Sequence, residues 1–205
     1  EGEEERVLRA VQVVVDEGLA RPVLIGRPAV LERRLARLGL RIQPGVDFDL
    51  INPESDPRYS DYWRTYHQLA ERKGVSPEYA KIEMRRRLTL IGCMLMYKGE
   101  ADGLLCGTFG THALHLTYVD QVIGRKAGVS CYAAMNALML PGRTVFITDT
   151  YVNPDPSADL LAEITLLAAE EVRRFGIVPK IALLSASSFG SVDLPSSSKM
   201  RDALA

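Results

Sequence analysis

Apolar and polar positions alternate along the first half of the chain in blocks that predict helices and strands in turn. Residues 4–16 and 29–38 carry apolar side chains near the helical period. Residues 22–25 and 48–51 are short apolar runs bounded by glycine, proline or polar residues, as expected for strands. Because strands alternate with helices, this half predicts a parallel sheet.

The next segments predict helices rich in aromatic residues. One covers residues 58–72, and Ser76-Pro77-Glu78 supplies a cap, a first-turn proline and an acidic residue for another that runs to Lys98. The aromatic side chains of the first helix suit core packing better than a patch for stacking a ligand. They are Tyr59, Tyr62, Trp63, Tyr66 and His67.

Residues 99–124 form the stretch around which the chain is arranged. An apolar run at Leu104 and Leu105 predicts a short strand, glycines follow, and a helical pattern begins at Thr111. Thr108 or Thr111 can cap this helix, so that free amides and the helix dipole would attract an anion. The alternative is a plain strand-to-helix connection, since the glycine spacing is not that of a dinucleotide-binding loop.

The second half changes character after a polar hinge, and we place a domain boundary at Ala127, giving domains 1–127 and 128–205. The apolar run 129–140 and the strand 144–148 are joined by a Pro-Gly turn and predict an antiparallel pair. A helix over 157–175, a strand over 181–184 and a short helix over 196–204 follow.

A loop rich in hydroxyl groups follows the strand predicted over 181–184. Ligands of open α/β sheets bind beyond the carboxyl ends of strands, so this loop suits a phosphate or a thioester, although such loops also serve as flexible linkers. The residues concerned are Ser185, Ser187, Ser188, Gly190 and Ser191.

Three consecutive arginines, Arg85 to Arg87, lie on the helix that leads into the stretch 99–124. They can contact a phosphate with two hydrogen bonds each, or form a solvated charged run.

Composition excludes some functions. The 205 residues are 47% hydrophobic with a formal net charge of −1, which shows no bias toward nucleic acid or anionic membranes. No apolar run reaches the roughly 20 residues that span a bilayer, and the acidic start is unlike a signal peptide. We therefore expect a cytoplasmic protein.

Cys93, Cys106 and Cys131 lack the spacing of zinc or redox sites and are expected to be buried, reduced thiols. One alternative is that Cys106 is a nucleophile. Another is a metal site that would combine side chains at the start of the predicted helix with nearby ones. Its ligands would be Asp102, Cys106, His112 and His115.

Several motifs together resemble one known family. They are Glu-Ala-Asp-Gly at 100–103, Gly-Val at 128, Val-Asn-Pro-Asp-Pro at 152–156 and Leu-Leu-Ser-Ala-Ser-Ser-Phe-Gly-Ser at 183–191. The whole chain resembles the phosphate acetyl/butyryltransferase family. Residues 62–67, 71–75 and 106–110 look most like the phosphotransacetylase-like C-terminal domain of bacterial NADP-dependent malic enzymes.

The resemblance implies two α/β/α domains with mainly parallel sheets and a cleft between them, as in phosphotransacetylase and isocitrate dehydrogenase. Family members exchange an acetyl group between coenzyme A and phosphate, without a metal or a covalent enzyme intermediate. The malic-enzyme relatives use the domain to sense acetyl-CoA, and family members pair through the second domain. The implied acetyl-CoA-binding residues are Arg86, Thr108, Thr111, His112, Ser185, Ser187, Ser188, Gly190 and Ser191.

Some features depart from the family pattern. Transacetylases usually carry an arginine in the helix after the glycine turn, where this chain has Thr117. The family's first strand and its late Asn-Asp-Leu-Ser-Arg-Gly stretch are not found within the chain, so we expect a domain that is incomplete at both ends.

We therefore expect an acetyl-CoA-binding regulatory domain of a malic enzyme, without acetyl transfer activity of its own. NADP and a divalent metal would belong to a malic domain elsewhere in the parent protein. The alternative is an active phosphate acetyltransferase in which another arginine replaces the one absent at Thr117.

Overall fold

The computed structural model describes residues 1–188 and 191–205, and its contacts divide the chain into two units, 1–124 and 125–205. The first unit is built on a two-stranded parallel sheet of β1 (Val23–Ile25) and β2 (Asp49–Ile51). Leu24 pairs with Leu50 and Ile25 with Ile51 in this sheet. The parallel pairing confirms the prediction from the alternating pattern.

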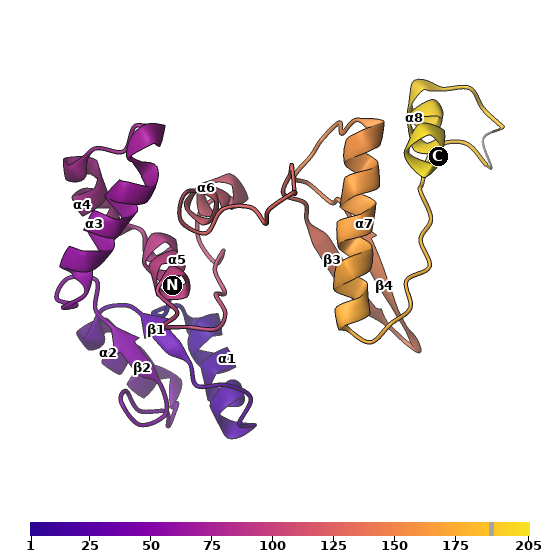
Figure 1. The fold of residues 1–205 in the computed structure, drawn as a ribbon. Helices are drawn as coiled ribbons and strands as arrows, with labels where there is room; N and C mark the ends of the chain where they lie inside the picture. The colour runs from indigo at the N-terminus through magenta and orange to yellow at the C-terminus, as the bar shows by residue number, and fades with distance from the viewer. Residues whose placement is uncertain (189–190) are drawn as a thin grey trace. The chain divides into compact units, whose positions relative to one another are not determined.

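Side-chain alternation along the two strands gives the sheet two apolar faces. Leu24 and Leu50 pack with α1 (Glu5–Asp16) and α2 (Pro28–Leu38), whereas Ile25 and Ile51 belong to a second core formed with the later helices. Figure 1 shows α1 and α2 near the strands and the remaining helices of the unit beyond them.

The second core is formed by helices between residues 59 and 122. They are α3 (Tyr59–Ala70), the 3₁₀ turn η1 (Glu71–Lys73), α4 (Pro77–Arg86), α5 (Leu88–Tyr97) and α6 (His112–Val122). Tyr62 and Tyr66 of α3 are buried in this core, so core packing is the role of these two aromatic residues.

The single helix predicted to run to Lys98 is wrong, because the chain breaks at Arg87. Arg87 has an extended backbone (φ −109°, ψ 97°), and its N–H closes α4 on the Glu83 carbonyl at 2.8 Å. The break falls where the sequence changes from a charged, amphipathic helix to an apolar one. Residues 89–95 of α5 are all buried, so α5 lies within the core, whereas α4 buries only one face.

The strand predicted at Leu104 and Leu105 is also absent from the described part of the first unit. Leu104 packs against Gly92 of α5, whereas Leu105 is fully exposed. These two apolar residues pair with no described strand, and they lie in an irregular loop. The helix predicted after it is confirmed as α6, and the Thr111 hydroxyl accepts a hydrogen bond from the Leu114 N–H at 3.4 Å.

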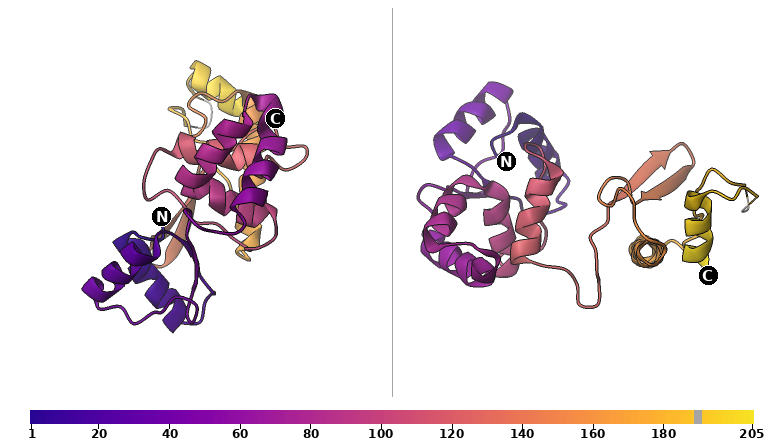
Figure 2. Two further views of the ribbon diagram at one scale, coloured as in Figure 1. Left: turned by 90° about the vertical axis from the view of Figure 1, so that its left-hand side faces the viewer. Right: turned by 90° about the horizontal axis from the view of Figure 1, so that it is seen from above.

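The second unit holds an antiparallel hairpin of β3 (Met135–Leu140) and β4 (Arg143–Thr148), as predicted, although β3 starts later than residue 129. The helices α7 (Ala158–Arg174) and α8 (Pro195–Leu204) pack on each other, and α7 lies beside the hairpin (Figure 2).

The strand predicted over 181–184 is wrong. Ile181 and Leu184 are exposed, and this segment pairs with no strand of the described chain. The hydroxyl-rich loop that follows therefore does not extend from a strand end in this structure.

No helix in the described part of the chain is long and apolar enough to cross a membrane.

Candidate anion-binding site

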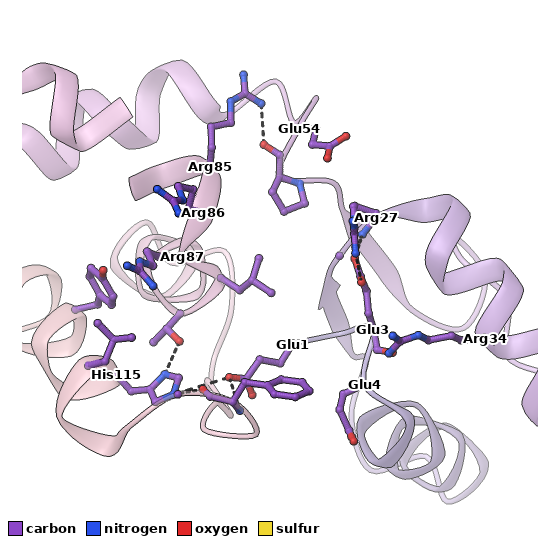
Figure 3. Close-up of a pocket in the computed structure, with 18 residues that line it drawn as sticks. Glu1, Glu3, Glu4, Arg27, Arg34, Glu54, Arg85, Arg86, Arg87 and His115 are labelled. Atoms are coloured by element: carbon purple, nitrogen blue, oxygen red, sulfur yellow. Dashed lines mark hydrogen bonds and ion pairs between the residues drawn. The ribbon is translucent and has the colours of Figure 1, made fainter. Parts of the chain in front are cut away.

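A pocket of about 560 Å³ lies in the first unit, where both parallel strands end (Figure 3). Gly26 and Arg27 directly follow β1, and Pro53 and Glu54 follow β2. Ligands of α/β sheets usually bind at this edge, because the carboxyl ends of parallel strands meet there. The other walls come from the break between α4 and α5, from residues 109–110 and from α6.

Arg85, Arg86 and Arg87 all line this pocket. Arg85 and Arg86 lie in the last turn of α4, about 100° apart around the helix axis, whereas the extended backbone of Arg87 takes its side chain off the helical path. Arg85 donates to the Pro53 carbonyl at 2.7 Å, and its guanidinium lies 3.6 Å from the centre of the Tyr59 ring. The side chain of Arg86 forms no hydrogen bond or ion pair with any described residue, so its guanidinium is available to an anion.

Arg87 is held by a carboxylate on the preceding turn. Its Nε donates to Glu83 Oε2 at 3.1 Å, and Glu83 is only 4% exposed. The Tyr118 hydroxyl on α6 donates to the same oxygen, and burial together with this hydrogen bond raises the pKa of Tyr118. Glu83 therefore ties α4 to α6 and fixes the direction of Arg87.

Three consecutive backbone amides beside the pocket point at one carboxylate. The N–H groups of Gly107, Thr108 and Phe109 donate to the Glu1 carboxylate at 3.1, 2.6 and 3.3 Å. These three N–H groups form an amide nest. Gly107 has φ of +112°, a conformation that favours glycine and lets the nest form. Burial alone would raise the pKa of Glu1, but hydrogen bonds from Thr108 and Phe109 outweigh it and lower the pKa.

His115 holds the nest against the helices. Its Nε2 lies 2.7 Å from the Phe109 carbonyl oxygen and its Nδ1 lies 2.7 Å from the Thr89 hydroxyl. A carbonyl can only accept, so Nε2 carries the proton and donates. This hydrogen bond connects the loop at Phe109 to α6.

A further ion pair closes the pocket near β1. Arg27 donates to both carboxylate oxygens of Glu3 at 2.9 Å, and Arg34 donates to the Glu3 carbonyl. The Arg27 side chain lowers the pKa of Glu3 to about 2, so that Glu3 stays ionised near neutral pH. These two arginines are therefore already committed to residues of this chain.

Comparisons with known proteins identify the family of this chain. The sequence profile of the phosphate acetyl/butaryl transferase family matches residues 1–205. The chain belongs to this family. The phosphotransacetylase of Streptococcus pyogenes has a similar structure, with a TM-score of 0.86 and 32% identity over 99% of this chain and 61% of that one. This similarity confirms the α/β fold expected from the sequence.

The most similar curated relatives include malic enzymes. The NADP-dependent malic enzyme of Escherichia coli is 55% identical over 204 residues, and the NAD-dependent malic enzyme of Rhizobium meliloti is 52% identical over 204 residues. Each match covers all of this chain but only 27% and 26% of the respective enzyme. The chain thus spans about a quarter of these relatives and corresponds to their phosphotransacetylase-like part.

Not all residues that the family resemblance implied lie at this pocket. Arg86 lines it, and Thr108 supplies the shortest amide contact of the nest. Thr111 acts as the helix cap, and His112 is exposed at the first position of α6 without lining the pocket.

The remaining implied residues belong to the second unit. The Ser185 hydroxyl accepts from the Ser187 N–H at 3.2 Å, and the Ser187 hydroxyl accepts from the Val192 N–H at 3.0 Å. The Ser191 N–H donates to the Ser188 carbonyl at 3.1 Å. Gly190 lies outside the described residues. The Ser185 and Ser187 hydroxyls thus form hydrogen bonds within their own loop.

The expectation of three buried cysteines is wrong for Cys106, which is exposed, and Cys131 is only half-buried. Desolvation of the sulfur atom by its surroundings and the negative charge of Glu1 raise the pKa of the Cys106 thiol, which disfavours the thiolate that a nucleophile needs. Within the part of the chain that the structure describes, no three His, Cys, Asp or Glu side chains gather as a metal site requires. The four-residue metal hypothesis therefore has no support in the geometry.

Sequence reasoning missed Glu1, Glu83 and Thr89 as residues of the site. Glu83 had a signal, because it precedes Arg87 by four residues on a predicted helix. Glu1 had none, since its contact with the nest joins segments more than 100 residues apart in the sequence.

Proposed function

We propose that this chain is the acetyl-CoA-binding regulatory domain of an NADP-dependent malic enzyme and does not itself transfer acetyl groups. The main evidence is the pocket itself. The unpaired Arg86 lines it, and the amide nest lies beside it. Both groups favour anions, and coenzyme A carries several phosphate charges. The 55% identity to a malic enzyme supports the assignment to a malic enzyme.

The proposal includes the remaining ligand-binding residues named above. Thr111 and His112 would act near the phosphates, and the serine loop with Gly190 would lie near the thioester. NADP and a divalent metal would be used by the malic part of the parent protein. Nucleic acid and membranes are not expected partners, and a cytoplasmic location is part of the proposal.

The proposal predicts that the complete natural protein binds acetyl-CoA with one site per chain. Titration calorimetry measures this directly, and acetyl-pantetheine, which has no phosphate groups, is the control ligand. Phosphate recognition by arginine and amides predicts much weaker binding of acetyl-pantetheine. Ser187→Ala should also weaken acetyl-CoA binding. Equal binding of the two ligands would contradict the assignment of the pocket.

An active phosphate acetyltransferase is the second candidate, favoured by the 32% identity to the phosphotransacetylase of Streptococcus pyogenes. Binding of acetyl-CoA fits both candidates, so only an activity assay separates them.

We further propose that the protein self-associates through its second unit. The β3–β4 hairpin exposes apolar side chains, and Met139 is 88% exposed. A closed two-fold dimer is the commonest way to cover such a surface. Light scattering on the complete protein should show a dimer or larger assembly that Met139→Glu reduces in mass. The matched control is Leu105→Glu, a fully exposed leucine of the first unit, and an equal response of both variants would refute this interface.

A further inference from the structure

The contact between Glu1 and the amide nest has the form of a bound anion. One carboxylate accepts hydrogen bonds from three consecutive backbone N–H groups, and the bond from Thr108 at 2.6 Å is the shortest of them. Backbone nests of this kind also hold phosphate groups in proteins, because the N–H dipoles converge on a single point. Figure 3 shows Glu1 between this loop and the pocket.

The nest is also held by a hydrogen bond that does not involve Glu1. His115 Nε2 donates to the Phe109 carbonyl, Thr89 holds the other ring nitrogen, and Nε2 lies 3.9 Å from the Glu1 carboxylate. Thr89 is only 6% exposed and lies on α5, whose residues from Thr89 to Leu95 are all buried. The loop is thereby fastened to the core of the first unit. We expect its amides to stay in place when the Glu1 carboxylate leaves.

We propose that the amides of Gly107, Thr108 and Phe109 bind a phosphate group of the ligand, and that the Glu1 carboxylate is an internal competitor that this phosphate must displace. The identity of the ligand as a coenzyme A ester rests on the proposed function, whereas the competition between Glu1 and a phosphate does not. Two anions cannot share three donors, because their charges repel each other at this distance. If a side chain of the protein occupies the site, the apparent affinity for the ligand falls in proportion to the fraction of molecules whose site is empty.

The main test is Glu1→Gln in the complete natural protein. The amide of glutamine is neutral, and a neutral acceptor forms hydrogen bonds about half as strong as a charged one. The variant should therefore bind both inorganic phosphate and acetyl-CoA more tightly, by about tenfold, which corresponds to about 1.4 kcal/mol. Titration calorimetry with each probe measures the change.

Glu54→Gln is the matched control. Glu54 lines the same pocket, is exposed and has no contact with the amide nest, so this change removes the same charge from the same pocket. We expect less than about a twofold change in either affinity, as for exposed charges screened by salt. An equal gain in both variants would show a general charge effect and overturn the proposal.

A second variant removes the nest itself. Gly107→Ala places a side chain at φ of +112°, so the loop must change conformation and the three amides no longer converge. Phosphate binding should be lost. Gly45→Ala is the control, because Gly45 also has a positive φ (79°), meets no atom within 4 Å of an added Cβ and lies away from the pocket. Thermal unfolding of both variants shows whether either change unfolds the protein.

The outcomes separate this inference from the proposed function. If the wild type binds acetyl-CoA and Glu1→Gln does not tighten it, Glu1 is no competitor and the inference fails alone. If Glu1→Gln tightens inorganic phosphate while no variant binds acetyl-CoA, the inference holds and the proposed function fails. Retention of phosphate binding in a folded Gly107→Ala protein would place the phosphate elsewhere and overturn the inference.

Discussion

Arg86→Ala should weaken acetyl-CoA binding by roughly 10- to 150-fold, as expected for losing a charge-assisted contact of about 1.5–3 kcal/mol. We chose Arg86 because it lines the pocket and its side chain has no hydrogen-bond or ion-pair partner among the described residues. Arg85 is occupied by the Pro53 carbonyl and Tyr59, and Arg87 by Glu83. Removing Arg86 therefore takes away an interaction with the ligand and breaks no contact that stabilises the fold.

Titration calorimetry on the complete protein measures the change, with Arg33→Ala as the matched control. Arg33 is an exposed arginine of α2 that bonds the Ala29 carbonyl of its own helix and does not line the pocket. The control should bind acetyl-CoA as the wild type does. Unchanged affinity in Arg86→Ala would mean that the ligand binds away from this wall.

The same variant tests regulation. If acetyl-CoA inhibits malate oxidation by the parent enzyme, binding and inhibition are thermodynamically linked, so Arg86→Ala should require a correspondingly higher acetyl-CoA concentration for inhibition. Inhibition at the wild-type concentration together with weakened binding would separate the effector site from this pocket.

Local patterns predicted much of the fold. The apolar periods of α1, α2 and α7 and the Pro-Gly turn before β4 act through neighbouring residues, so they can be read along the chain. The predicted strands near Leu105 and over 181–184 failed for the opposite reason. A strand needs hydrogen bonds from another segment, and an apolar run does not reveal whether such a segment is available.

The features of the site also divide into those set by neighbouring residues and those that depend on distant segments. The arginines and the glycine loop were visible in the sequence, because charge and glycine spacing are local features. The break at Arg87 depends on α5 turning into the core, and the Glu1 contact depends on folding across the whole first unit. The sequence therefore indicated an anion site but could not show which arginine is unpaired or that a carboxylate already occupies the nest.

The complete protein should convert acetyl phosphate and coenzyme A to acetyl-CoA at least roughly 100-fold more slowly than a phosphotransacetylase, which is the usual cost of losing one charge-stabilising donor. The reason is Thr117, at the position where the family resemblance implies an arginine. Its hydroxyl donates to the Ala113 carbonyl of its own helix at 2.8 Å, so it offers neither a charge nor a free donor to an acyl phosphate.

Thioester absorbance measures the reaction, with the phosphotransacetylase of Streptococcus pyogenes assayed beside it as the active reference. Arg86→Ala serves as the internal control, because any transfer catalysed at this pocket must fall in that variant, whereas contaminating activity stays constant. Transfer at the rate of the reference enzyme, lost in Arg86→Ala, would establish the phosphate acetyltransferase alternative. Since Thr117 is exposed on α6, Thr117→Arg should fold normally, and it should raise the rate only if the missing charge alone limits transfer.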